Sequence, residues 1–283
     1  MSTAVLWMLA ALACFAALDT TTKVVSRLAP VLLVVWFRFL FQGVLSTLLL
    51  VPRRRRLRSL RSRHEKLQWL RGVSLVGCSL FAILALQHLP LGEFTAILML
   101  TPLSIALMAV RAQGERIGPL HWALLFGGMA GALIILRPGS AMFGWAVLLP
   151  LAVVVCNTAY QLVTARLARR EDSGITQCYT GWIGALVTSA ALPWAWQSVG
   201  ARTWALMALI GLLGSAGHLL LMQAYRRAPP GRLAPFLYGQ IGFATLASWW
   251  VFDHTPDALA WLGLVMIAGC GAASTLLPVP RER

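Results

Sequence analysis

Ten long apolar stretches run along the chain, separated by short polar or turn-forming connections, and they fall into two groups of five. About 20 consecutive apolar residues are enough for one helix to cross a bilayer. The stretches do not alternate polar and apolar residues as membrane β-strands do, so the pattern predicts helices and not a barrel. The predicted spans are 4–23, 31–51, 67–87, 93–111, 119–136, 144–165, 174–195, 203–224, 232–252 and 258–276.

An odd number of spans in the first group means that the second group enters the membrane from the opposite side. The groups also share a connection: residues 89–93 (LPLGE) and residues 228–232 (APPGR) each follow a span and open the next. We therefore expect an all-α integral membrane fold of ten transmembrane helices in two inverted five-helix repeats, residues 1–139 and 140–283. Many carriers use this plan to open one midplane site to each side in turn.

The composition agrees with a membrane protein, being 59% hydrophobic and 12% charged with a mean hydropathy of +0.75. A soluble domain has about twice that charged fraction. The net charge of +15 would suit nucleic acid, but the basic residues gather in one connection that begins with the run 53–58. Because cytoplasmic loops collect Lys and Arg, this run indicates orientation. We expect the lipid bilayer as a partner and no nucleic acid.

The remaining basic residues agree with that orientation. When both termini are placed in the cytoplasm, the inside set contains most Lys and Arg residues, and it includes Arg71 at the start of the third span. The outside set contains only Lys23, Arg27, Arg137 and Arg202. This asymmetry predicts a multi-pass protein of the cell inner (plasma) membrane with both termini cytoplasmic.

Ionisable residues inside spans are informative because each costs roughly 2.5–3.5 kcal/mol near the centre of a membrane helix. Asp19 and Lys23 are four residues apart and share one helix face. Arg38 lies well inside the second span. Asp19 has three open interpretations: an ion pair with Lys23, an ion pair with Arg38, or binding of a cationic group or proton in a cavity. We take all three residues as candidate substrate-binding residues.

Two further polar groups complete the candidate site. Asn157, Tyr160, Gln161 and Thr164 recur at helical spacing on the sixth span, and such a stripe faces either a neighbouring helix or a cavity, not lipid. His218, Tyr238 and Gln240 form the second group, on the eighth and ninth spans. A membrane histidine either packs through a hydrogen bond or titrates in a cavity, and its partner is not visible from the sequence. Of these, Asn157, Tyr160, Gln161, His218, Tyr238 and Gln240 are candidate substrate-binding residues.

Glycines and span-end acids indicate how the helices pack and end. Gly131 and Gly263, in the fifth and tenth spans, predict close helix packing or a homodimer contact. Gly214 in the eighth span suits a bend during gating. Glu115 fits an interfacial turn, and Asp257 has the charge that favours the N-terminus of the last helix.

An integral-membrane enzyme acting on a lipid-linked substrate is the alternative function. The chain has no HExxH, no GxSxG and no paired Asp motif within its spans, so we expect no enzyme activity and no catalytic residues. The five cysteines form neither a CxxC pair nor a metal-like cluster, so no metal or cofactor is expected. A non-transporting scaffold would leave the inversion and the buried charges without a purpose. No Walker motif is present, so ATP is not a direct drive.

The order of several motifs resembles the EamA-type family of the drug/metabolite transporter superfamily. The first half carries Pro102 in the fourth span, the turn 114–116 (GER) and the end 137–139 (RPG). The second half carries 234–240 (APFLYGQ), which is similar to S-adenosylmethionine-type carriers, as are Asp19 with Lys23 and Arg38. The resemblance implies a secondary, ATP-independent transporter working by alternating access. Its substrate would be a small polar metabolite: an amino acid, a nucleoside or S-adenosylmethionine-like compound, or a drug.

Overall fold

The computed structural model describes residues 2–50, 62–88, 91–115, 117–137, 145–252 and 255–276, and every regular element within them is a helix. The first half contains α1 (Ser2–Val25), α2 (Val31–Leu50), α3 (Glu65–His88), α4 (Leu91–Leu98), α5 (Leu100–Gln113) and α6 (Pro119–Leu136). The second half contains η2 (Trp145–Val147), α7 (Leu148–Ala168), α8 (Ser173–Ser189), α9 (Leu192–Ala195), α10 (Ala201–Arg227), α11 (Pro230–Leu233), η3 (Ala234–Tyr238), α12 (Gly239–Phe252) and α13 (Ala258–Leu276).

Seven helices in the described residues are long and apolar enough to cross a membrane: α1, α2, α3, α6, α7 with its leading turn η2, α10 and α13. The other three predicted spans are shorter or interrupted. The span predicted at 174–195 is divided between α8 and the short α9. The spans predicted at 93–111 and 232–252 are each broken into pieces, so the count of ten continuous spans stays a prediction.

Prolines explain the breaks in the spans predicted at 93–111 and 232–252. Pro102 has no N–H for the carbonyl of Leu98, and its ring would collide with that carbonyl in a regular helix. The chain accordingly breaks at Met99, between α4 and α5. In the second half, Pro230 opens the single turn α11, and Pro235 lies in the 3-10 helix η3 that precedes α12.

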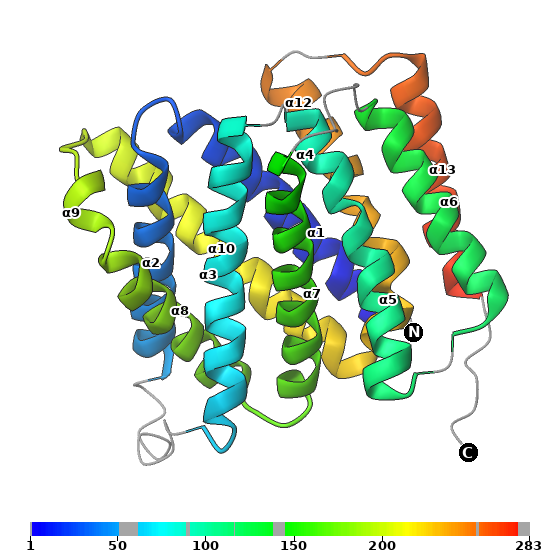
Figure 1. The fold of residues 1–283 in the computed structure, drawn as a ribbon, viewed down its shortest axis with the longest axis horizontal. Helices are drawn as coiled ribbons and strands as arrows, with labels where there is room; N and C mark the ends of the chain where they lie inside the picture. The colour runs from blue at the N-terminus through cyan, green and yellow to red at the C-terminus, as the bar shows by residue number, and fades with distance from the viewer. Residues whose placement is uncertain are drawn as a thin grey trace.

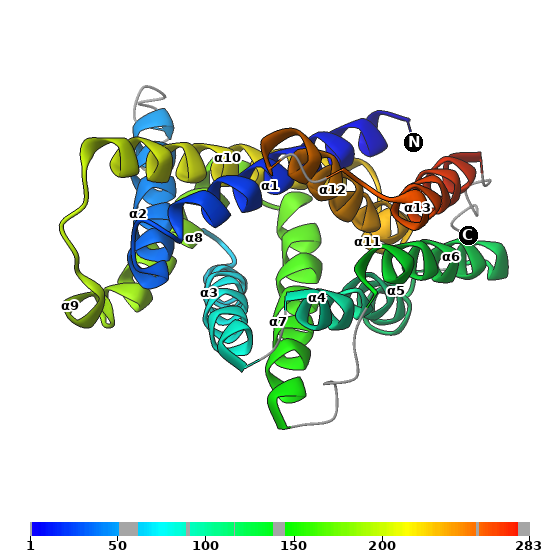
Figure 2. The same ribbon diagram turned by 90° about the horizontal axis from the view of Figure 1, so that it is seen from above.

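The helices pack in a bundle whose neighbours are mostly far apart in the sequence (Figure 1). The main pairs are α1 with α10, α2 with α8, α3 with α7, and α6 with α13. α12 packs on α1, while α4 and α5 pack on α7. In Figure 1 the tilted α1 and α10 cross behind α3 and α7, and Figure 2 shows them running side by side along one edge of the bundle.

Glycines bring two of these pairs into backbone contact. A Cβ added to Gly263 would lie 2.5 Å from the carbonyl oxygen of Gly131, and one added to Gly181 would lie 2.3 Å from the backbone nitrogen of Gly43. The predicted close packing of the fifth and tenth spans is therefore a contact of α6 with α13 inside one chain. Small residues allow this approach where larger side chains would separate the helices.

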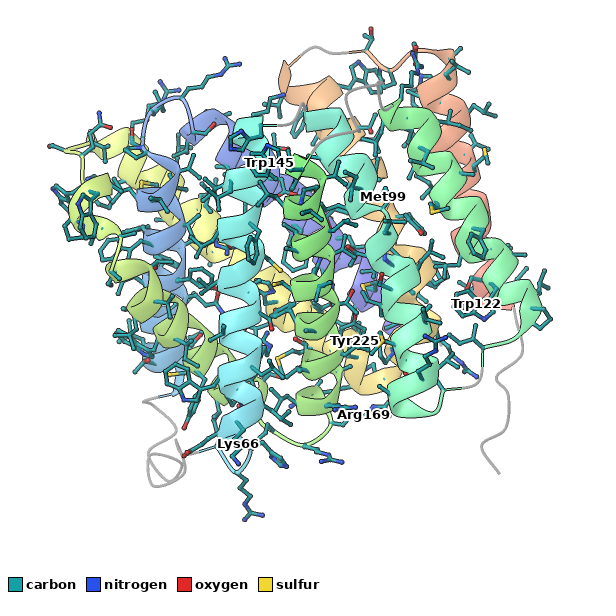
Figure 3. The ribbon with its side chains drawn as sticks, viewed as in Figure 1. Lys66, Met99, Trp122, Trp145, Arg169 and Tyr225 are labelled. Atoms are coloured by element: carbon teal, nitrogen blue, oxygen red, sulfur yellow. The ribbon has the colours of Figure 1, made fainter. Side chains whose placement is uncertain are left out.

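Large apolar side chains cover much of the outside of the bundle, among them Val155, Leu186 and Trp250, which are 69%, 65% and 88% exposed. Such a surface suits lipid. Charged side chains lie toward an end instead: Figure 3 places Lys66 and Arg169 together at one end and Trp145 at the other. The basic run 53–58, Arg116 and the C-terminal arginines lie outside the described residues.

One basic residue was assigned to the wrong place by the sequence. Arg71 was counted among the cations of an inside connection, but it lies in the second turn of α3 and its side chain is fully buried. Its charge therefore belongs to the interior of the bundle and does not report on orientation.

Candidate binding site

A buried polar cluster centres on Tyr160 of α7. Its hydroxyl accepts a hydrogen bond from the Arg71 guanidinium, with Nη2 at 2.8 Å, and lies 2.8 Å from Nδ1 of His218. The Arg71 guanidinium carbon also lies 4.8 Å from the centre of the Tyr160 ring. One tyrosine thus joins α3, α7 and α10.

Arg71 is held entirely by neutral groups. Its Nε donates to Thr164 Oγ1 at 2.9 Å, and its Nη1 donates to Thr180 Oγ1 and to the Thr176 carbonyl. None of its hydrogen-bond partners in the described part of the chain is a carboxylate. A buried charge is strongly destabilising unless hydrogen bonds replace water, and here α7 and α8 supply them. Sequence reasoning missed this residue because Arg71 lies near a span end, where arginines usually reach water.

His218 is 5% exposed and packs against aromatic rings. Its ring centre lies 5.0 Å from that of Phe15 on α1. Gly217 makes this possible, since a Cβ there would lie 2.6 Å from the Phe15 ring. Tyr160 is the partner that the sequence could not identify. The other ring nitrogen, Nε2, is buried and has no hydrogen-bond partner in the described structure.

Arg38 enters the same interior from α2. Its side chain passes α10 at Gly214, where a Cβ would lie 3.8 Å from Arg38 Cδ. Nη2 donates to Ser79 Oγ of α3 at 3.3 Å, and the guanidinium carbon lies 4.6 Å from the Phe39 ring centre. Nε is buried without a hydrogen-bond partner among the described residues. Fewer of the N–H donors of Arg38 than of Arg71 are therefore satisfied by hydrogen bonds.

Asp19 does not form the ion pair with Arg38 that was one of its three interpretations. Its Oδ2 accepts a hydrogen bond from Gln240 Nε2 of α12 at 2.9 Å, and no salt bridge joins it to Arg38 in the described residues, although the two charges interact electrostatically. The side chain is exposed. It nevertheless shares a helix stripe with Leu12 and Phe15, which pack toward α12 and α10. Asp19 thus lies at the edge of the bundle, beside its interior.

The other candidates divide between packing and open positions. Gln161 accepts a hydrogen bond from Tyr225 of α10 at 2.8 Å, which is a helix-to-helix contact. Tyr238 is fully buried, and its hydroxyl donates to the Met99 carbonyl at 3.3 Å. Asn157 is half-buried and its amide has no hydrogen bond within the described chain. Lys23 is exposed in the last turn of α1.

Arg71, Tyr160 and His218 form one buried polar cluster on α3, α7 and α10, and Arg38 of α2 and Asp19 of α1 lie beside it. These five side chains offer one carboxylate, two guanidiniums, an imidazole and a phenol. Groups of three or more His, Cys, Asp or Glu residues that would hold a metal are absent from the described residues. The arrangement suits recognition of a polar solute. A separate hollow lined by Leu246, Ala247, Trp249 and Trp250 lies on α12, and its apolar lining suits lipid.

Polar contacts also close the end of the bundle that carries Lys66. Glu171 accepts hydrogen bonds from Ser62 Oγ and the Arg63 N–H at 2.9 Å each, and pairs with His64 Nδ1 at 2.9 Å. Burial raises the pKa of Glu171, but these hydrogen bonds outweigh it and hold the pKa below its ordinary value. Glu115, after the left-handed Gly114, accepts a hydrogen bond from the Gly231 N–H at 2.9 Å.

At the opposite end, Asp257 is in the position expected from its charge. Its Oδ1 accepts a hydrogen bond from the Ala260 N–H in the first turn of α13, at 2.9 Å. Both carboxylate oxygens also accept hydrogen bonds from Arg137 Nη2, at 2.7 and 2.6 Å. Asp253, four residues before Asp257, lies outside the described residues.

Comparison with known proteins identifies relatives over most of the chain. The profile of the EamA-like transporter family matches residues 2–137 and again residues 144–274. A "Riboflavin transporter" of Rhizobium johnstonii is 32% identical over 205 residues, covering 71% of this chain and 67% of that protein. A "Riboflavin transporter" of Brucella anthropi is 26% identical, covering 93% and 94%. An "S-adenosylmethionine uptake transporter" of Rickettsia bellii is 24% identical, covering 92% and 89%.

A solved structure has the same fold. A crystal structure described simply as that of a protein superposes with a TM-score of 0.83, at 22% identity, over 98% of this chain and 97% of that one.

Proposed function

The chain belongs to the EamA-like transporter family, and from this premise we propose that it is a secondary carrier working by alternating access. The family and its named relatives make the protein a multi-pass membrane transporter of small metabolites. The relatives are named as transporters, which points away from an enzyme. The proposal adds that transport needs no ATP and that the interior polar cluster binds the substrate.

Two inverted five-helix repeats, residues 1–139 and 140–283, are part of this proposal. Helix packing supports them. Suppose that α1, α2 and α3 of the first half correspond to α7, α8 and α10 of the second half. The partner of the pair α1–α10 is then the pair α7–α3, and both pairs pack closely. In the same way, the partner of the pair α1–α12 is α7 with α4 and α5, which also pack. The family profile matches the two halves separately, which supports the same division.

The distribution of ionisable residues supports the placement of the substrate site. Asp19, Arg38, Tyr160 and His218 come from four different helices: Tyr160 and His218 are buried together, Arg38 enters the same interior, and Asp19 lies at its edge. Intramembrane charges are usually kept for function because they are costly. The position of Asp19, a carboxylate inside an apolar span on a stripe that packs toward the interior, is the single observation that carries the site assignment. Tyr160 and His218 would form the buried part of the substrate site.

We propose an orientation in which the end that carries Lys66 and Arg169 faces the cytoplasm, together with both termini, in the inner membrane. Positive residues favour that side. The chemical class of the substrate follows the relatives: a flavin or an S-adenosylmethionine-like compound is the first choice. A homodimer remains an open part of the proposal.

Uptake into liposomes tests the function. Purified protein in ATP-free liposomes is expected to accumulate labelled riboflavin or S-adenosylmethionine faster than empty liposomes. Asp19→Asn is expected to reduce the initial rate by at least about tenfold, which corresponds to about 1.4 kcal/mol. Asp257→Asn is the matched control, because this carboxylate lies at a helix end and is expected to leave the rate nearly unchanged. Equal rates for Asp19→Asn and the wild type would remove Asp19 from the site.

A further inference from the structure

The interior contains more positive than negative charge. Arg38 and Arg71 both lie in it, His218 and Arg71 both contact Tyr160, and Asp19 is the acidic side chain that interacts with Arg38. None of the carboxylates in the described residues forms a salt bridge with either arginine. Buried guanidiniums normally pair with an anion or have all their N–H groups satisfied.

The two arginines differ in how far they are satisfied. The donors of Arg71 bond to three side chains and a carbonyl, so this residue ties α3 to α7 and α8. Arg38 has one long contact, to Ser79, and its Nε is buried without a partner in the described chain. A buried donor without an acceptor is destabilising unless a ligand or water supplies one. Arg38 is therefore the guanidinium that is open to a ligand.

We propose that Arg38 binds an anionic oxygen group of the transported solute, a carboxylate or a phosphate. This inference rests on the carrier function proposed above and specifies its substrate class. A planar guanidinium binds such groups through paired N–H donors. Ser79 Oγ of α3 lies within hydrogen-bond reach of Arg38. Asp19 of α1 interacts electrostatically with Arg38 and suits a cationic group of the same solute.

Matched ligand pairs test the charge preference and distinguish the two anions. Riboflavin and its 5′-phosphate differ by a phosphate, and decarboxylated S-adenosylmethionine and S-adenosylmethionine differ by a carboxylate. Binding of all four to the full chain in nanodiscs is measured by calorimetric titration. At least one anionic member is expected to bind about tenfold or more tightly than its partner, as for a single charge-assisted contact.

Variants assign that preference to Arg38. Arg38→Gln is expected to remove the difference within the pair, and Arg38→Lys to keep part of it. Ser79→Ala removes the hydrogen-bond partner of Arg38 but keeps its charge, and it is expected to keep at least part of the preference, which separates a charge effect from damage to local packing. Arg202→Gln, an exposed arginine at the start of α10, is the matched control.

The inference is overturned if no anionic member binds better than its partner, if none of the four binds, or if Arg38→Gln keeps the preference. It is also overturned if Ser79→Ala loses the preference as fully as Arg38→Gln does. Riboflavin uptake into liposomes without any preference for the phosphate or the carboxylate would leave the carrier function standing and remove only the anion site. Absence of any uptake would instead count against the carrier function.

Discussion

Removing the Tyr160 hydroxyl tests whether the buried cluster holds the bundle together. Tyr160→Phe removes the acceptor of Arg71 Nη2 and the partner of His218 Nδ1, so it leaves two buried polar groups unsatisfied. Tyr225→Phe is a close control. Tyr225 is also fully buried, but its hydroxyl makes one bond, to the neutral amide oxygen of Gln161.

The expected magnitudes follow from these bonds. A hydrogen bond to a charged group contributes about 1.5–3 kcal/mol and a neutral one about 0.5–1.5 kcal/mol. Measured hydrogen bonds between membrane helices lie at the low end, averaging about 0.6 kcal/mol, because the unfolded chain in the membrane also finds partners. We therefore expect Tyr160→Phe to lower the free energy of unfolding by about 2–3 kcal/mol and Tyr225→Phe by about 1 kcal/mol or less.

Equilibrium unfolding by sodium dodecyl sulfate in mixed micelles measures both values, with the twelve tryptophans as the fluorescent signal. The difference between the variants matters more than either value, since both lose the same atom from the same residue type. Equal losses, or a larger loss for Tyr225→Phe, would show that the Arg71 and His218 contacts are not a special source of stability.

Two further changes test the packing and the end of the bundle that carries Lys66. Gly263→Ala places a Cβ 2.5 Å from the Gly131 carbonyl oxygen and is expected to lower stability by about 1–3 kcal/mol, while Gly269→Ala, with nothing within 4 Å, is the neutral control in thermal unfolding. Because the pKa of Glu171 is lower in the folded protein than its ordinary value of 4.5, the ionised carboxylate stabilises the fold at pH values above 4.5. This stability is lost as the pH falls from 4.5 through the folded-state pKa. Glu171→Gln is expected to flatten the stability–pH curve there, and an unchanged acid limb would contradict that assignment.

The apolar pattern predicted where the chain is helical more accurately than where each helix is continuous. Long uninterrupted runs such as those of α1 and α13 agree with the structure to within a few residues. The span around Met99 was predicted as one piece, because Pro102 is as apolar as its neighbours and hydropathy does not register its missing N–H. Helix breaks of this kind depend on which backbone N–H groups are present, and hydropathy averaged over a window of residues does not record that.

The partners within the site were beyond the reach of the sequence. Asp19, Arg38 and His218 were identifiable because an ionisable residue in an apolar run is rare. Their contacts, with Gln240, Ser79 and Tyr160, join helices far apart in the chain, and helical spacing gives no information across such distances. Whether Asp19, Arg38 and the other candidates bind a substrate stays a prediction.

The two spans that prolines interrupt, 93–111 and 232–252, contact each other. The Tyr238 hydroxyl, at the end of η3, donates to the Met99 carbonyl at the break between α4 and α5. Proline breaks of this kind are where helices kink. Because this hydrogen bond joins one break to the other, bending the chain at either break would displace a bonding partner in the opposite half.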